Sequence, residues 1–70
     1  MLITPRKHAL LALREARRLY PTICNRASAR FVVARSIIND RVRRIERTGS
    51  PRLREVALPI YRDTLALLNN

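Results

Sequence analysis

Five polar side chains between residues 35 and 43 are of the types that read the edges of DNA bases. They are Arg35, Ser36, Asn39, Asp40 and Arg43. In the major groove, arginine pairs with guanine, asparagine pairs with adenine, and a carboxylate accepts a hydrogen bond from the cytosine amine. The carboxylate of Asp40 has the alternative role of orienting a neighbouring arginine. We predict a recognition helix from about Ala34 to Arg47, with these side chains directed into the groove.

An apolar stripe at helical spacing would hold this helix on a core. The stripe consists of Ala34, Ile38, Val42 and Ile45, whose separations are four, four and three residues. The polar side that remains is narrow enough to enter the major groove. The alternative is an ordinary amphipathic helix whose charged side is simply solvated.

The segment from Ala27 to Gly49 resembles the helix-turn-helix of small phage and bacterial DNA-binding repressors. In that motif a short helix carries a small residue early and an apolar residue before the turn, and a recognition helix follows. One apolar residue lies in the turn, and two more are buried in the second helix. The matching positions are Ser28, Phe31, Val33, Ile38 and Val42.

The resemblance implies a helix-turn-helix over residues 22–48 and double-stranded DNA as the partner. The sequence departs from the family at Val32, where the motif usually has glycine. A β-branched residue disfavours a left-handed turn. The segment therefore has either a remodelled turn near residues 32 and 33 or a different structure.

Proline and glycine mark the ends of the remaining elements. The pairs Thr4-Pro5 and Ser50-Pro51 predict helix starts, because a hydroxyl caps the first turn and proline needs no backbone hydrogen bond there. Pro21 ends the first helix, and Gly49 is well placed as the C-terminal cap of the long central helix. Pro59 predicts a break in the last helical stretch.

Almost every segment favours helix, and strand signals are weak. We predict one all-α domain over residues 1–70, with three to four helices that include the helix-turn-helix. A miniature winged helix is the second choice, in which Leu53 to Leu58 forms a wing strand and Ile60 to Leu68 forms a closing helix.

The charge balance favours an anionic partner. The chain has 70 residues, of which 15 are basic and 5 acidic, so its net charge is +10, and every basic residue except Lys7 is arginine. Such a surplus most often indicates nucleic acid and less often an acidic protein. The predicted contacts to phosphates, or to the acidic groups of a protein, are Arg14, Arg18, Arg26, Arg30, Arg44 and Arg47.

No group of residues predicts an enzyme, a cofactor or a metal site. His8, the single histidine, lies beside Arg6 and Lys7 in the first turns of a helix, where we expect it to be exposed to solvent. Cys24 is the single cysteine, so it forms no internal disulfide and no zinc site, and we expect it to be a small core residue. One glycine is too few for a phosphate-binding loop.

Together these features predict a small DNA-binding transcriptional regulator of phage or plasmid type. The alternative is a non-enzymatic inhibitor or antirepressor that binds and masks an acidic protein, such as a repressor or another host or phage regulator. RNA is a weaker candidate, because Tyr20, Phe31 and Tyr61 are the only residues for base stacking. A membrane-surface role is the weakest, because the helices have core-like stripes and the chain has no tryptophan.

The two ends of the chain bear on assembly and location. Leu65, Leu67 and Leu68 exceed what so small a core is expected to bury, which predicts a homodimer or a heteromeric contact there. Met1 to Arg6 is too short and too polar for a signal peptide, and no apolar run reaches the roughly 20 residues of a membrane span. We therefore expect no membrane association and a cytoplasmic location, in a bacterium or a phage-infected host cell.

Overall fold

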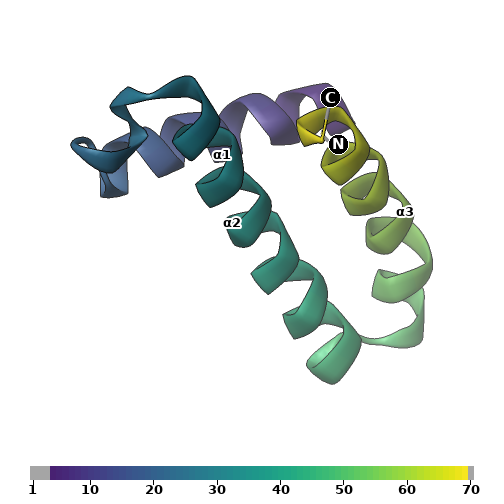
Figure 1. Cartoon of the computed structure of the whole chain (residues 1–70). Coiled ribbons are helices and arrows are strands. Elements are labelled where there is room, and N and C mark those ends of the chain that lie inside the picture. The colour runs from purple at the N-terminus through teal and green to yellow at the C-terminus, as the bar shows by residue number, and fades with distance from the viewer. Residues whose placement is uncertain (1–3, 70) are drawn as a thin grey trace.

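The computed structural model describes residues 4–69, which form three α-helices and one turn of 3₁₀ helix (Figure 1). The elements are α1 (Pro5–Leu19), η1 (Ile23–Asn25), α2 (Ala27–Thr48) and α3 (Pro51–Leu68). No strand occurs among these residues, so the predicted all-α class is confirmed and the wing strand expected at 53–58 is wrong. That segment lies within α3, in keeping with the helix-forming character of its leucine, arginine and glutamate side chains.

The starts of α1 and α3 use the same local device, as the sequence predicts. The side-chain oxygen of Thr4 accepts a hydrogen bond from the backbone N–H of Lys7 at 3.3 Å. The side-chain oxygen of Ser50 accepts one from the N–H of Leu53 at 3.2 Å. In each helix a proline occupies the first turn, where its missing N–H would have had no partner.

The three helices meet at one end of the molecule. α2 and α3 form a hairpin joined at residues 49 and 50, and α1 lies across the end of the hairpin that is far from this connection (Figure 1). The hydroxyl of Thr64 in α3 is buried, donates to the carbonyl of Ile60 at 2.8 Å and lies 3.4 Å from the carbonyl of Pro5 in α1. The end of the hairpin at residues 49 and 50 projects away from this crossing (Figure 1).

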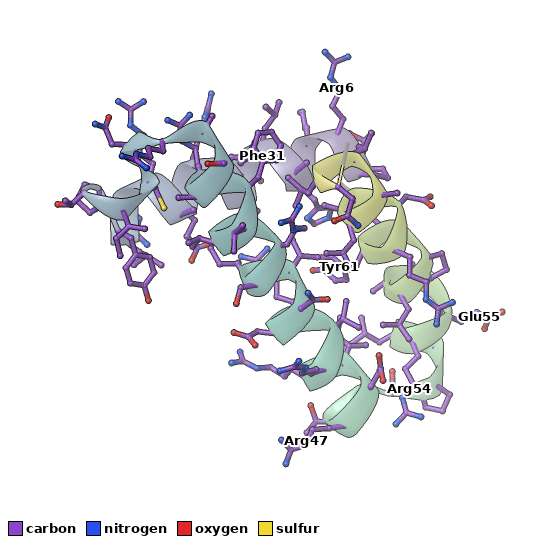
Figure 2. All side chains as sticks on the ribbon, viewed as in Figure 1. Arg6, Phe31, Arg47, Arg54, Glu55 and Tyr61 are labelled. Carbon is purple, nitrogen blue, oxygen red and sulfur yellow. The ribbon has the colours of Figure 1, made fainter. Side chains whose placement is uncertain are left out.

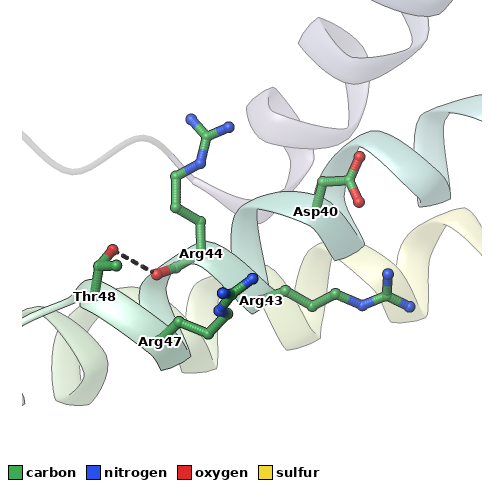
Figure 3. A pocket seen from close by; sticks show the side chains of 5 residues that line it. All are labelled: Asp40, Arg43, Arg44, Arg47 and Thr48. Atoms are coloured by element: carbon green, nitrogen blue, oxygen red, sulfur yellow. Dashed lines mark hydrogen bonds between the residues drawn. The ribbon is translucent and has the colours of Figure 1, made fainter.

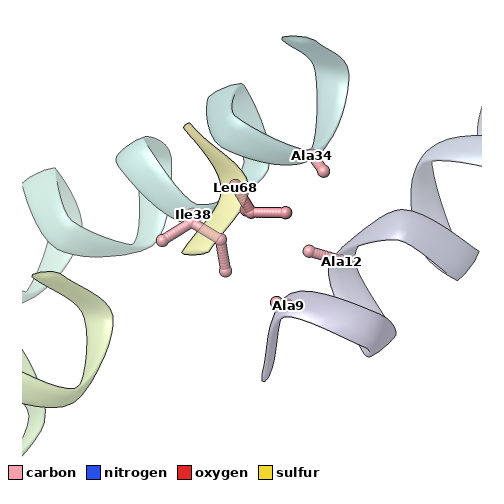
Figure 4. Close-up of a cluster of buried hydrophobic side chains, with 5 residues drawn as sticks. All are labelled: Ala9, Ala12, Ala34, Ile38 and Leu68. Atoms are coloured by element: carbon pink, nitrogen blue, oxygen red, sulfur yellow. The ribbon is translucent and has the colours of Figure 1, made fainter. Parts of the chain in front are cut away.

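The core lies at this crossing and consists mostly of small side chains. Ala9 and Ala12 of α1 face Ala34 and Ile38 of α2, and Leu68 of α3 closes the cluster (Figure 4). Because alanine side chains are small, the helix axes approach closely at the crossing. The larger side chains of Ile38 and Leu68 fill the space that remains between the helices. The apolar stripe predicted for the central helix is confirmed in its burial, because its first two members are buried and its last two are half-buried.

The turn predicted at residues 32 and 33 is wrong. α2 continues through both valines, and no residue between 4 and 69 has a positive φ angle. Valine strongly disfavours the left-handed conformation that the motif requires at this point. A continuous helix keeps the backbone hydrogen bonds that a turn would break. It also loses no apolar burial, because Phe31 still packs against the core and Val32 is exposed.

The break predicted at Pro59 is also wrong, because α3 continues through it to Leu68. Proline removes one helical hydrogen bond, which frees the carbonyl of Glu55 four residues earlier. Both Pro59 and Glu55 are exposed, so water is able to hydrate that carbonyl. The last turns of α3 carry buried side chains, and their burial offsets the cost of the proline.

Gly49 caps α2 as predicted, although by close approach rather than by a left-handed conformation. Its φ angle is −71°, and its N–H donates to the carbonyl of Ile45 at 2.8 Å. A β-carbon at this position would lie only 2.5 Å from that same carbonyl oxygen. The absence of a side chain is therefore what allows the chain to leave α2 and enter α3 within two residues.

His8 is half-buried, contrary to the exposure expected from the sequence. Its ring packs against the ring of Tyr61 with the centroids 5.0 Å apart, and Figure 2 shows Tyr61 between the helices. The Nδ1 atom of His8 is buried and has no hydrogen-bond partner among the described residues. Burial, and secondarily the positive charge of Arg41, lowers the pKa of His8 below its usual 6.5.

Replacement of the central core side chain tests the crossing. Ile38→Ala is expected to lower the free energy of unfolding by roughly 2–5 kcal/mol, because it removes buried methylene groups and leaves a cavity. Urea denaturation followed by circular dichroism measures this change. Ser36→Ala on the exposed side of the same helix is the control, with an expected change within about 0.5 kcal/mol. Equal effects of the two substitutions would contradict the described core.

The lowered pKa of His8 predicts a pH-dependent stability. The unfolded chain binds the proton more readily than the folded chain, so the stabilisation is complete above about pH 6.5. It decreases as the pH falls from there toward the pKa of the folded state. Urea denaturation at several pH values between about 7.5 and 5.5, above the range in which carboxylates titrate, detects the loss. His8→Phe is expected to flatten the profile; an unchanged slope in this variant would assign the effect to other groups.

Candidate nucleic-acid interface

Exposed cations of α1 and α2 line a series of shallow hollows that share residues with one another. The first hollow, of about 390 Å³, lies around Leu10 and Leu11 of α1. The last, of about 360 Å³, lies near the C-terminal end of α2. Two further hollows connect them through Glu15 and Asp40. We call this surface the basic face; its cations are Lys7, Arg14, Arg18, Arg41, Arg43, Arg44 and Arg47.

One ion pair lies at the middle of the basic face. The guanidinium of Arg41 in α2 donates to the carboxylate of Glu15 in α1 at 3.1 Å, and both side chains are about one-third exposed. A pair with this exposure contributes at most about 1 kcal/mol to stability. The pair joins α1 to α2 beside the crossing that the core already fixes.

The C-terminal half of α2 carries four arginines, of which three are exposed. Arg43, Arg44 and Arg47 are exposed within two helical turns, and no ion pair to any of them occurs between residues 4 and 69 (Figure 3). The hydroxyl of Thr48 donates to the carbonyl of Arg44 at 2.8 Å, which closes the last turn. Cations near the C-terminal end of a helix are favoured by its dipole, yet they repel each other. A bound polyanion removes that repulsion.

Four of the five side chains predicted to read bases lie on the exposed side of α2, opposite the buried Ala34 and Ile38. They are Ser36, Asn39, Asp40 and Arg43. The fifth, Arg35, is placed differently: it is half-buried, and its Nη1 donates to the carbonyl of Leu68 at 3.2 Å. The last carbonyls of a helix lack partners within the helix, so Arg35 satisfies one of them at the end of α3.

The arginines predicted to contact phosphates divide into two groups. Arg14 and Arg18 of α1, and Arg44 and Arg47 of α2, belong to the basic face. Arg26 is exposed at the start of α2 and lines none of the four hollows that form this surface. Arg30 has a structural contact, because its Nε donates to the carbonyl of Cys24 at 3.1 Å and so ties η1 to α2. Cys24 is buried with a free thiol, as expected from the sequence.

The apolar C-terminal end predicted as a contact surface is largely internal. Leu68 is only 2% exposed and belongs to the core, and Leu65 packs against that core. Leu67 alone is well exposed, at 46%. The prediction of an exposed Leu68 is wrong because the last turn of α3 inserts between α1 and α2, where it fills space that their alanines leave.

Positive charge extends beyond the basic face. Figure 2 shows Arg54 at the connected end of the hairpin, near Arg47 of the basic face, and Arg6 at the opposite end. Two exposed leucines, Leu10 and Leu11, lie among the cations of α1. Helical spacing could have identified both, because the residues that pack inward from α1, Ala9, Ala12, Leu13 and Ala16, lie on its other side.

No protein-family model, curated protein or solved structure gives a significant match to the chain. Within residues 4–69, no helix is long and apolar enough to cross a membrane. The same residues contain no group of three histidine, cysteine, aspartate or glutamate side chains arranged to hold a metal ion.

The position of Arg35 predicts a role in stability rather than in base recognition. Arg35→Ala is expected to lower the free energy of unfolding by about 1 kcal/mol, because the carbonyl of Leu68 loses its hydrogen bond. Arg43→Ala, which removes an exposed arginine of the same helix, is expected to change it by less than about 0.5 kcal/mol. Chemical denaturation of both variants measures the difference, and a stable Arg35→Ala variant with altered DNA preference would reverse the assignment.

Proposed function

We propose that the protein is a small DNA-binding regulator that contacts duplex DNA through the exposed side of α2, with cations of α1 on flanking phosphates. The observation that carries this proposal is the cluster of Arg43, Arg44 and Arg47 on the half of α2 that projects beyond α1 (Figure 3). Three exposed guanidiniums within two turns favour a repeating anion over a single carboxylate.

The dimensions of α2 suit the major groove. It has 22 residues, which at 1.5 Å per residue makes it about 33 Å long. The major groove is wide enough to admit a single α-helix. On the exposed side of α2, Asn39 and Arg43 lie one turn apart, and their side chains have the hydrogen-bonding groups that pair with adenine and guanine, respectively. Asp40 lies between them in sequence and serves either to accept from cytosine or to orient an arginine.

Phosphate contacts come from both helices of the basic face. Arg44 and Arg47 extend from α2, and Arg14 and Arg18 extend from α1. The packing of α1 on α2 sets the relative position of these two groups of cations, and the ion pair between Glu15 and Arg41 lies between them. Phosphate contacts position a protein on the duplex, and contacts to base edges then select the sequence.

The regulatory role in this proposal is supported by the resemblance of Ala27 to Gly49 to small phage and bacterial repressors. Since the turn of that motif is not formed, the support comes from the second helix and its polar side alone. A continuous α2 presents this side without the first helix of the motif, which crosses the DNA backbone in repressors. In our proposal α1 supplies the backbone contacts instead.

Fluorescence anisotropy with a labelled duplex tests the proposal. If about four phosphates are neutralised, affinity is expected to fall by roughly two orders of magnitude between 50 and 200 mM salt. Arg44→Gln and Arg47→Gln are each expected to weaken binding to all sequences and to reduce the salt slope by about one. Asn39→Ala and Arg43→Ala are each expected to cost roughly 1–3 kcal/mol on the preferred sequence, found by selection from a random duplex pool, and little on other duplexes.

Arg62→Gln on the exposed side of α3 is the matched control, because it removes the same charge outside the basic face. Binding that depends only on net charge would respond equally to Arg62→Gln and to Arg47→Gln, and this result would reject the interface. An affinity that is flat across the salt range would reject DNA as the partner.

A further inference from the structure

The outward side of α1 combines exposed leucines with cations, which is not what DNA binding requires. Leu10 is 51% exposed and Leu11 is 46% exposed, and together with Lys7 and Arg14 they line a hollow of about 390 Å³. A sugar–phosphate backbone offers little apolar surface to cover two leucines. Apolar anchors surrounded by a charged rim are instead typical of protein interfaces.

These residues lie in a row along the axis of α1, and this arrangement favours an elongated partner. Lys7, Leu11, Arg14 and Arg18 are separated by four, three and four residues, which places them in a single row along about three turns of α1. Leu10 lies beside this row, and the next hollow continues it around Leu11 and Arg18. A row of this kind matches a second helix that lies along α1.

Three of the four side chains in this row are cations, so a helix that lies along it is expected to carry carboxylates. We infer that the outward side of α1 binds an amphipathic acidic helix of a partner protein. Leu10 and Leu11 serve this contact alone, whereas Arg14 and Arg18 are shared with the phosphate contacts of the proposed function, so the acidic helix and duplex DNA compete for these two arginines. Leucine or similar side chains of the partner occupy the hollow that Leu10 and Leu11 line together with Lys7 and Arg14. Its carboxylates pair with Lys7, Arg14 and Arg18, which carry no ion pair within residues 4–69.

Other occupants fit this surface less well. A second copy of the chain would bring a net charge of +10 against a basic surface, and the two copies would repel each other. An anionic membrane binds helices whose broad apolar side is free to enter the bilayer. The apolar side of α1 that carries Ala9, Ala12 and Ala16 is already buried in the fold, so α1 exposes individual leucines (Leu10, Leu11 and, at its end, Leu19) but no broad apolar side.

The test uses two synthetic 15-residue helical peptides of one composition. In the first, leucines at positions i, i+4 and i+7 are flanked by glutamates; in the second, the same residues are scrambled. NMR titration of the ¹⁵N-labelled full chain is expected to show shifts along α1 between Lys7 and Arg18 with the first peptide. The scrambled peptide is expected to bind at least about tenfold more weakly.

Variants separate the apolar anchors from simple attraction between charges. Leu10→Ser combined with Leu11→Ser is expected to weaken binding of the acidic peptide about tenfold, and to leave affinity for duplex DNA within about twofold. Leu67→Ser, which removes an equally exposed leucine of α3, is the control and is expected to change neither. Lys7→Gln is expected to weaken peptide binding more than Arg62→Gln does.

Several results would overturn the inference. They are the absence of peptide binding, equal binding of the scrambled peptide, and shifts confined to Arg43, Arg44 and Arg47 of α2. Binding of vesicles of phosphatidylcholine and phosphatidylglycerol that requires Leu10 and Leu11, without binding of the peptide, would assign the surface to a membrane. Loss of DNA binding in the leucine double variant would show that the two surfaces are one, whereas failure of DNA binding alone leaves the inference on α1 standing.

Discussion

The close crossing of three helices at a core of small side chains is the constraint on which the rest of this structure depends. Only Ile38 and Leu68 are both large and fully buried among the core hydrophobic residues described, and alanines surround them. A chain of this length buries only about 60% of the surface that its unfolded form exposes, so the core is small, and half-buried side chains such as Leu13 and Phe31 pack around these two. The position of Ile38 and Leu68 at one end of the α2–α3 hairpin leaves the other end of α2 packed against α3 alone.

Polar contacts reinforce the same crossing, each between a different pair of elements. Arg35 of α2 satisfies a carbonyl at the end of α3, and Thr64 of α3 lies against the first carbonyl of α1. Glu15 and Arg41 join α1 to α2. The arginines therefore divide into two groups: some complete the fold, and others stay exposed, where the proposed function assigns them to an anionic partner.

The exposed charge links stability to binding. A net charge of +10 on 70 residues produces self-repulsion in the folded state, and one ion pair among the described residues relieves little of it. A polyanion bound to the basic face reduces this repulsion and, because it binds the folded state, stabilises the fold. A protein partner that covers the exposed leucines of α1 would stabilise the folded state in the same way, because the leucines would gain apolar contacts that the small core does not supply.

Local pattern was sufficient for the helical class, the starts of α1 and α3, the cap at Gly49 and the buried stripe of α2, since each depends on residues within one or two turns. The exposed positions of Ser36, Asn39, Asp40 and Arg43 followed from the same periodicity. The continuity of α2 at Val32 has a local cause, because valine disfavours the left-handed turn. The continuity of α3 at Pro59 depends on tertiary packing, because Thr64 and Leu68 in its last turns are buried. The burial of Leu68 and the contact that removes Arg35 from the exposed side depend on where α3 ends relative to α2, a distance of 33 residues in sequence. Periodicity assigns a residue to one side of its own helix, whereas only the crossing of helices determines which sides are covered and which arginines remain free.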